Sequence, residues 1–581
     1  MKEKFKRFLK TLTPWKVIVA ILFTWFIAVS IIIPIVNLLK TVFVSPDGTV
    51  SFEIFSKLLK SKKAMNSLKN SFILGPTLAI TVGIVGIFIV LVTEYFDIKG
   101  SKILRLGYMT TLLYGGIILV SGYKFIYGSN GFLTNLIVQV FPSFNRSWFQ
   151  GYWAVLFVMT FSNTSNHMIF LSNAMRAVDF QTVEAARNMG ANQWTILKRV
   201  VLPVMLPSLF AVTILTFITG LSAMSAPQLV GGTGFQTINP MIKTFADTTG
   251  SKDLAALLSI VLGLATMILL FIMTNIEKRG HYMSVSKVKT KIVKQKIANP
   301  VANVIVHILA YVLFIIYVIP VILIILFSFT SSKNIATRTL DFSSFSLENY
   351  IYLLSNKFNY TPFVTSIVYS ILAAVVISVI VVAACRIIQK NKDKLSSKLL
   401  ETTLMIPWLL PITLVALALM LLYNQSHWYM FGKVLTGTTV IMLIGYVVIK
   451  LPFSMRMIKA AFFGLDNALE DASKNLGAKG WYTFRRIILP SLLPTIMAVA
   501  ALNINALSRD YDMSSFLYHP VYPTLGVKIK SLTEETANAN GTALTLVYAV
   551  LMMIISGIIL YLVYGRGSNE DKPKRVRRKK A

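Results

Sequence analysis

Long apolar stretches alternate with short polar segments along the whole chain. A helix needs about 20 apolar residues to cross the hydrocarbon core of a bilayer, and twelve stretches reach or approach this length. They are residues 17–39, 71–93, 105–127, 151–173, 203–224, 254–275, 303–329, 363–386, 401–423, 435–455, 490–507 and 541–564. The pattern predicts an all-α integral membrane protein with about 12 transmembrane helices.

Two of the polar segments repeat one another. Residues 184–203, EAARNMGANQWTILKRVVLP, return as residues 471–490, DASKNLGAKGWYTFRRIILP, displaced by 287 positions. A match at a fixed offset indicates a tandem duplication. Each copy follows the fourth apolar stretch of its half. Because six spans return the chain to the same side of the membrane, we expect two parallel six-helix repeats.

The repeated segment predicts a bent pair of short helices. The residues before Gly190 favour a helix, and a glycine at this point suits a helix end with positive φ. A second short amphipathic helix carries Trp194, and Pro203 suits the first turn of the next apolar helix. Such a segment would lie outside the membrane but is too apolar to stand bare in water, so it predicts a protein partner.

These residues resemble the EAA loop of permease subunits of binding-protein-dependent ABC importers, which have the type I importer (MetI-like) fold. In that family the loop is the coupling helix that docks into a groove of the cytoplasmic ATPase. The coupling residues implied by the resemblance are Glu184, Ala185, Ala186, Gly190, Trp194 and Pro203 in the first copy and Asp471, Ala472, Ser473, Gly477, Trp481 and Pro490 in the second. Asp471 and Ser473 depart from the pattern, which predicts weaker or asymmetric docking. The alternative, a basic linker between spans, does not explain two copies at matching positions.

Composition and charge agree with a membrane protein. Hydrophobic residues make up 55% of the chain, charged residues 14%, and the net charge is +34. Of the 57 Lys and Arg residues, 39 fall on the side that holds both repeated segments and the two termini, which predicts a cytoplasmic location for that side. We therefore expect a multi-pass protein of a prokaryotic plasma (inner) membrane. The basic tail is typical of an anchor on anionic lipid and not of a nucleic-acid site.

The expected organisation has five parts. They are a cytoplasmic N-terminal basic segment at 1–16, a first permease half at 17–275 with its EAA loop at 174–202, a cytoplasmic linker at 276–302, a second half at 303–564 with its EAA loop at 456–489, and a basic cytoplasmic tail at 565–581.

The chain contains no phosphate-binding Walker sequence, and its one cysteine and five dispersed histidines suggest no metal site or catalytic group. We expect no cofactor in this chain and no enzymatic activity of its own. ATP and magnesium would be bound by a separate ABC ATPase dimer at the cytoplasmic face. Since no soluble region is long enough to bind a ligand, an extracytoplasmic substrate-binding protein is also expected.

A polar segment follows the fifth span of the second half. Asp510 and Asp512 lie there, and an acidic residue at membrane depth often faces a transport pathway. Pairing with Arg509 in water outside is an equal alternative. With Tyr518 and His519, this DYDMSSFLYHP segment resembles fused permeases of ferric-iron importers. The resemblance implies ferric iron or an iron complex as substrate, with thiamine, polyamine, sulfate or phosphonate as alternatives. An ion-gradient-driven twelve-helix secondary transporter would not explain the repeated loops.

Overall fold

The computed structural model describes residues 14–45, 47–176, 178–279, 293–391, 394–534 and 539–565. The predicted basic tail from residue 566 onward, most of the N-terminal segment and residues 280–292 of the linker lie outside the described residues. Within the described ranges the chain is helical, and its only β-structure is three isolated bridges.

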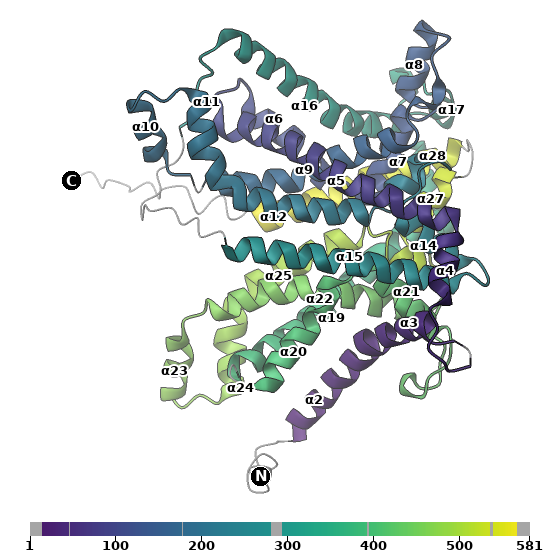
Figure 1. The fold of residues 1–581 in the computed structure, drawn as a ribbon, viewed down its shortest axis with the longest axis vertical. Coiled ribbons are helices and arrows are strands. Elements are labelled where there is room, and N and C mark those ends of the chain that lie inside the picture. The colour runs from purple at the N-terminus through teal and green to yellow at the C-terminus, as the bar shows by residue number, and fades with distance from the viewer. Residues whose placement is uncertain are drawn as a thin grey trace.

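The first half runs from α2 to α15 (Figure 1). Its helices are α2 (Pro14–Ile27), α3 (Ile33–Phe43), α4 (Glu53–Lys60), α5 (Lys62–Val90), α6 (Ser101–Tyr108), α7 (Gly116–Tyr127), α8 (Phe132–Val140), α9 (Tyr152–Met175), α10 (Phe180–Asn188), α11 (Gln193–Ile196), α12 (Leu202–Leu221), α13 (Ser225–Val230), α14 (Ile238–Asp247) and α15 (Lys252–Arg279).

The second half repeats this order. Its helices are α16 (Pro300–Ser328), α17 (Ser332–Thr337), α18 (Glu348–Ser355), α19 (Lys357–Lys390), α20 (Leu395–Met405), α21 (Ile412–Tyr423), α22 (Thr439–Phe463), α23 (Asn467–Asn475), α24 (Gly480–Thr483), α25 (Leu489–Leu507), α26 (Ser514–Leu517), α27 (Leu525–Glu534) and α28 (Ala539–Leu560). The central bundle α5–α9–α12 of the first half corresponds to α19–α22–α25 of the second. The two parallel repeats are confirmed.

The spans differ in detail from twelve straight helices. Nine helices of the described residues are long and apolar enough to cross a membrane, and two bent helix pairs raise the number to 11. The expected span over 105–127 is a bent pair of helices, because the chain turns by 110° between Leu112 and Gly116. The expected helix over 401–423 likewise bends by 104° between Leu409 and Ile412. Gly116, with φ +58°, and Pro411 interrupt helical geometry at these points.

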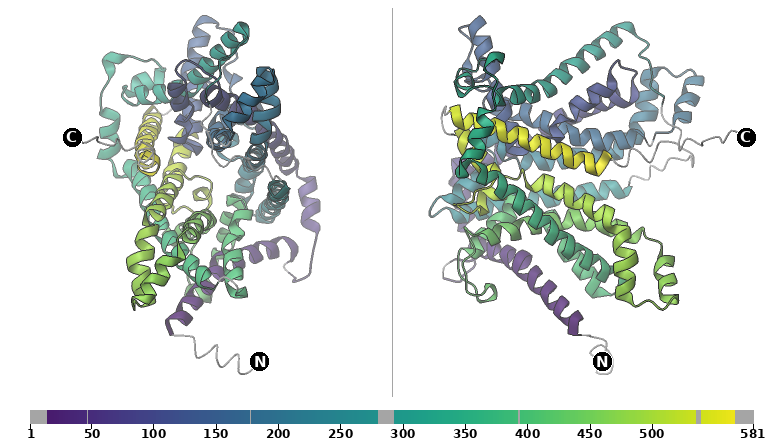
Figure 2. Two further views of the ribbon diagram at one scale, coloured as in Figure 1. Left: turned by 90° about the vertical axis from the view of Figure 1, so that its left-hand side faces the viewer. Right: turned by 180° about the vertical axis from the view of Figure 1, so that it is seen from behind.

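The first helix of each half packs on the other half. Helix α3 lies against α21 of the second half, and α16 lies against α6 and α7 of the first half (Figure 2). One tyrosine hydrogen bond supports each of these contacts. The Tyr423 hydroxyl donates to the carbonyl of Val29 and the Tyr108 hydroxyl donates to the carbonyl of Ala310, both at 2.7 Å. This exchange joins the halves into one body.

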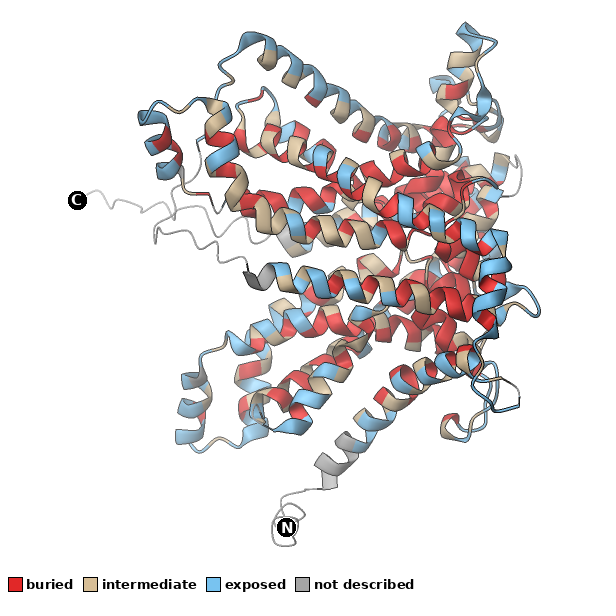
Figure 3. Ribbon diagram, in the orientation of Figure 1, coloured by how far each residue is buried: buried red, intermediate tan, exposed pale blue. Residues whose placement is uncertain are grey.

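The long helices run roughly side by side between two faces of the molecule. Helices α10 and α23 project from one face, and α15 ends and α16 begins toward the same face (Figure 1). Helices α4, α14 and α27 lie at the opposite face. Buried residues are most concentrated toward the latter face, where the helices converge, whereas α10 and α23 are mostly exposed (Figure 3).

Candidate functional site

Residues 180–196 and 467–483, here called the first and second elbows, have the same fold. Each contains a nine-residue helix (α10 or α23), a tight turn and one short helical turn (α11 or α24). An aspartate caps each longer helix: Asp179 accepts from the N–H of Gln181 at 3.0 Å, and Asp466 accepts from that of Ala468 at 2.9 Å. These caps are 287 positions apart, the offset of the sequence repeat.

Glycine makes the bend in both elbows. Gly190 has φ +82° and Gly477 has φ +81°, as the sequence predicted. After each glycine the chain closes back on the helix. The N–H of Ala191 donates to the carbonyl of Ala186, and that of Ala478 to the carbonyl of Ser473, both at 3.1 Å. This is the hydrogen-bond pattern of a helix that ends with a left-handed residue.

Both elbows present apolar side chains to solvent. Glu184 and Ala185 are exposed on α10, as are their equivalents Asp471 and Ala472 on α23. The largest exposed side chains flank the bends: Met189 (82% exposed), Trp194 (67%), Leu476 (88%) and Trp481 (72%). Large apolar side chains held in water at two equivalent places are typical of a docking surface for a protein partner.

The serine at position 473, where the EAA pattern has alanine, is explained by its contacts inside the bend. In the first elbow, the buried side chains of Ala186 and Ile196 occupy the inside of the bend. The equivalent residues of the second elbow, Ser473 and Thr483, are also buried, and their hydroxyls are hydrogen-bonded to each other at 2.7 Å. An apolar contact has been replaced by a satisfied polar one, so the bend itself is unchanged.

A π-helical turn joins each elbow to the following long helix. It covers residues Leu197–Val201 in the first half and Phe484–Ile488 in the second, again 287 positions apart. Pro203 and Pro490 follow as the second residues of α12 and α25. Because a π turn widens the helix, it accommodates the missing N–H of the proline.

The chain segment just before α16 lies against the first elbow. The carbonyl of Gln295 accepts from the N–H of Asp97 at 2.9 Å, and its side-chain oxygen accepts from Arg187 of α10. The side-chain oxygen of Gln193 on α11 accepts from the N–H of Ala298 at 3.1 Å. The C-terminal end of the linker therefore fastens the first elbow to its half.

An ion pair fastens the second elbow instead. Arg386 of α19 donates to both carboxylate oxygens of Glu470 on α23, at 2.9 and 3.0 Å. Hydrogen bonding from Arg386 holds the pKa of Glu470 below its usual range. The first-elbow residue equivalent to Glu470 is the buried Val183. The two elbows thus share one shape and have different attachments.

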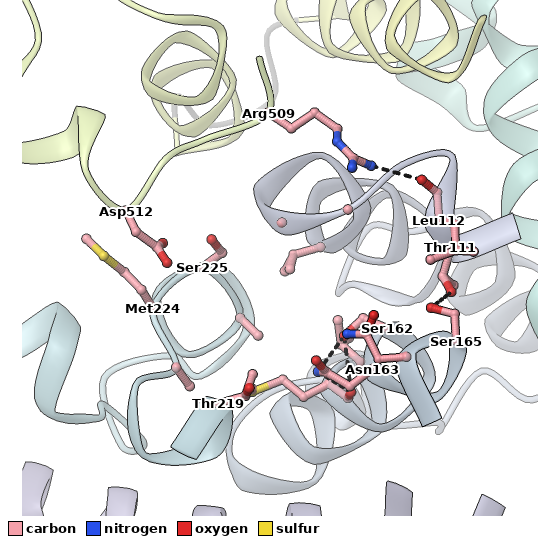
Figure 4. Close-up of a pocket in the computed structure, with 18 of the residues that line it drawn as sticks. Thr111, Leu112, Ser162, Asn163, Ser165, Thr219, Met224, Ser225, Arg509 and Asp512 are labelled. Atoms are coloured by element: carbon pink, nitrogen blue, oxygen red, sulfur yellow. Dashed lines mark hydrogen bonds between the residues drawn. The ribbon is translucent and has the colours of Figure 1, made fainter. Parts of the chain in front are cut away.

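A cavity of about 440 Å³ lies between the two halves (Figure 4). Hydroxyl and amide side chains make most of its polar lining: Thr111, Ser162, Asn163, Ser165, Asn166, Thr219, Ser222, Ser225 and Asn505. Two charged residues also line it. The guanidinium of Arg509 donates to the carbonyl of Leu112 at 3.2 Å, and the carboxylate of Asp512 lies beside Ser225. Within the described residues neither charge belongs to an ion pair.

Of the four residues predicted for a substrate pathway, the structure brings Asp512 to this cavity. Asp510 is turned toward its own backbone, where its carboxylate accepts from the N–H of Ser514 at 2.9 Å. Tyr518 and His519 follow α26 at a partly exposed turn and do not line the cavity. The described residues contain no group of three or more His, Cys, Asp or Glu placed to hold a metal ion.

Comparison with known proteins decides the family. A family model described as the inner membrane component of binding-protein-dependent transport systems matches residues 111–280 and 377–566, more than half of the chain. The chain belongs to this family. The model matches twice, once in each half, so this permease carries two family domains in one polypeptide.

Three proteins with similar sequences are named as transport permeases. A probable ABC transporter permease, y4fN of Sinorhizobium fredii, is 36% identical over 93% of this chain and 95% of its own length. A putative ferric transport system permease, FbpB 1 of Haemophilus influenzae, is 22% identical over 76% of this chain and 68% of its own length. A putative 2-aminoethylphosphonate transport system permease, PhnV of Salmonella typhimurium, is 27% identical over 28% of this chain and 58% of its own length.

Sequence reasoning about the permease missed the polar face of α9. Four of its residues, Ser162, Asn163, Ser165 and Asn166, line the cavity. A signal was present: residues 162–167 read SNTSNH in the middle of the expected span 151–173. This polar run also keeps α9 out of the set of helices apolar enough to span a membrane on composition alone. Polar residues at such a depth usually face a pathway or another helix.

Proposed function

We propose that this permease is driven by a separate ABC ATPase that docks on the two elbows. The observation that carries the proposal is the pair of equivalent bends on one face, each presenting an exposed tryptophan and acidic residue. ATP and magnesium would be bound by that partner. The elbow face would be cytoplasmic, in keeping with the distribution of Lys and Arg. Because the chain belongs to the family of binding-protein-dependent transport components, a secondary transporter is no longer a candidate.

On the opposite face, an extracytoplasmic binding protein would deliver the substrate. The cavity between the halves, with its hydroxyl, amide and two charged side chains, would be the translocation path. ATP-driven closure of the ATPase dimer would move the elbows together and turn the path from one side of the membrane to the other. Because the first helices of the halves are exchanged, the halves would rotate against each other without separating.

The experiment is affinity purification of the tagged chain from its own host membranes. A protein with a Walker ATPase sequence should co-purify, and combined Trp194→Ala and Trp481→Ala changes should release it. Trp428→Ala is the matched control, because this indole is 88% exposed in the loop between α21 and α22, away from the elbows. Retention of the ATPase by the double variant, or its equal loss from the control, would refute docking at the elbows.

For the substrate, ferric iron in an anionic complex is the first candidate. A relative is named as a ferric transport permease. A bare ferric ion needs several hard oxygen ligands, whereas the cavity offers one carboxylate, Asp512, beside many neutral donors and Arg509. These donors suit the oxygen atoms of a chelate. Uptake of radioactive iron supplied as its citrate complex, with and without this chain, tests the candidate.

A small aminoalkylphosphonate is the second candidate. The cavity holds one cation and one carboxylate that are not paired with each other, so a zwitterion could place its anionic group at Arg509 and its ammonium group at Asp512. A relative is named for 2-aminoethylphosphonate transport. Competition by excess unlabelled 2-aminoethylphosphonate distinguishes the two candidates. If the substrate is an aminoalkylphosphonate, its uptake would be suppressed. If the substrate is an iron complex, iron uptake would be unchanged.

A further inference from the structure

A second cavity, of about 790 Å³, lies toward the face opposite the elbows. Its lining comes from α7, α8 and the segments on either side of it, α16, the end of α17, the end of α27 and the start of α28. Helix α7 separates it from the cavity between the halves. Gly116 and Val120 line the first cavity, whereas Ile118, Ser121 and Phe125 line the second. The two cavities are therefore different sites.

Three cationic side chains line this second cavity, two from the first half and one from the second. The Lys124 ammonium donates to the carbonyl of Thr533 at 3.3 Å. Arg146 donates to the side-chain oxygen of Asn135 at 3.0 Å. Arg338 donates to the carbonyl of Ile335 at 2.8 Å and to a second carbonyl at 3.1 Å. All three are thus held by neutral acceptors.

The surroundings of Arg338 show that its place is fixed. It has φ +58°, directly after α17, and its guanidinium lies 4.2 Å from the ring centre of Phe125. Burial lowers the pKa of Arg338 to about 10, so it remains charged at neutral pH. A non-glycine residue in the left-handed region needs support from its neighbours, and these contacts supply it.

The positive charge is not balanced within the described residues. Lys124, Arg146 and Arg338 take part in none of the ion pairs there. Among the described lining residues there is one carboxylate, Glu534, which attracts Lys124 and is also paired with Lys530 at 2.9 Å. Three cations against one carboxylate leave the described lining with an excess of positive charge. Like charges that face one cavity repel each other, so an anion bound among them would be stabilised by all three.

Neutral groups indicate the kind of anion. The hydroxyl of Ser129 and the side-chain amides of Asn130 and Asn135 also line the cavity and can donate to oxygen atoms. The hydroxyls of Ser121 and Thr337 line it too, but they donate to carbonyls of their own helices. Guanidinium groups bind phosphate-like oxyanions through paired hydrogen bonds. Apolar side chains of α7, α16 and α28 form another wall, and the volume is that of a cavity for an organic ligand.

We propose that this cavity binds a phosphoryl-type oxyanion, supplied either by an anionic lipid headgroup or by a soluble phosphate or phosphonate compound. The anion would bridge Lys124 and Arg146 of the first half and Arg338 of the second. Because this cavity shares no lining residue with the first cavity, the proposal does not depend on the proposed function.

The test uses the full chain in phosphatidylcholine nanodiscs. Binding of radioactive inorganic phosphate is measured directly, and binding of added phosphatidylglycerol is followed by native mass spectrometry. Arg146→Gln and Lys124→Gln should each weaken binding about 10- to 100-fold, because each removes one charge-assisted contact. Lys333→Gln, on α17 but outside the cavity, is the matched control and should bind as the unchanged protein does.

The two probes identify the source of the anion. Binding of the lipid alone assigns the site to a headgroup, binding of phosphate alone assigns it to a soluble anion, and competition between them shows one shared oxyanion site. Each of these three results supports the proposal, provided that Arg146→Gln and Lys124→Gln weaken the binding of the probe that binds. If neither probe binds, or if both variants bind as well as Lys333→Gln, the proposal is overturned.

Discussion

The most direct test of the elbows is a β-branched residue at their bends. Gly190 and Gly477 have φ values of +82° and +81°, and a Cβ atom added at either would meet nothing within 4 Å. The cost of substitution is therefore conformational and not steric. A valine held in the left-handed region costs about 1–3 kcal/mol, which shifts the equilibrium away from the native bend by about 5- to 150-fold.

Gly190→Val and Gly477→Val should each abolish uptake without preventing membrane insertion. Asparagine tolerates positive φ better than other non-glycine residues, so Gly190→Asn should retain most of the activity and Gly190→Ala should be intermediate. The readouts are the amount of chain in the membrane, ATPase co-purification and uptake of the radioactive iron complex.

Gly250→Val is the matched control for this series. Gly250 also has φ +82°, has nothing within 4 Å of an added Cβ, and lies between α14 and α15, away from the elbows. The backbone cost is the same, but it falls on a turn with no proposed coupling role. Full uptake by both elbow variants, or equal loss in Gly250→Val, would refute the reasoning.

Three further predictions concern the inside of the second elbow, its attachment and the cavity. Ser473→Ala should expose the elbow to limited proteolysis, because it loses one buried hydrogen bond worth about 1 kcal/mol; adding Thr483→Ile should restore protection, since the pair then matches the first elbow. Arg386→Gln should speed hydrogen exchange in α23 at neutral pH. In the unchanged protein, the ion pair with Arg386 stabilises the elbow while Glu470 is ionised, and it lowers the pKa of Glu470. The protection factors of α23, which correct for the intrinsic pH dependence of amide exchange, should be full above the ordinary glutamate pKa and should fall as the pH drops through the lowered pKa of Glu470. Asp512→Asn should lower uptake at least about tenfold by removing one charged contact, with ATPase co-purification unchanged; normal uptake would remove Asp512 from the path.

The repeated segment could be predicted because its structure is local. The positive φ of Gly190 and Gly477 follows from backbone preferences of single residues. Pro203, expected in the first turn of a new helix, instead lies within the continuous helix Gln193–Leu221, directly after a π turn. The long apolar spans could also be predicted from local sequence, because the thickness of the bilayer sets the number of consecutive apolar residues that a spanning helix needs. These features needed no knowledge of which helices pack together.

Features that depend on packing between distant segments were beyond sequence reasoning. Nothing local shows that α3 packs on α21, or that the linker end at Gln295 reaches Arg187. Asp510 and Asp512 are two residues apart, yet one caps α26 and the other faces the cavity. The bends near Gly116 and Pro411 had signals in the sequence, but their apolar surroundings favoured one continuous span.

The two elbows allow the chain to be compared with itself. Columns that are identical in both copies lie where geometry or exposure demands it: Gly190 and Gly477 at positive φ, and Trp194 and Trp481 in solvent. Among the columns that differ, the buried Val183 of the first elbow corresponds to Glu470 of the second, which pairs with Arg386 of its own half. The exposed columns that differ, such as Glu184 and Asp471 or Met189 and Leu476, keep their acidic or apolar character. After a duplication, the buried residues of each copy can change to fit their own half. The exposed residues of the two elbows would stay alike only if both exposed surfaces served the same purpose. A shared outward surface is what two copies of one docking partner require, and for this reason we expect both elbows to bind the same kind of ATPase subunit.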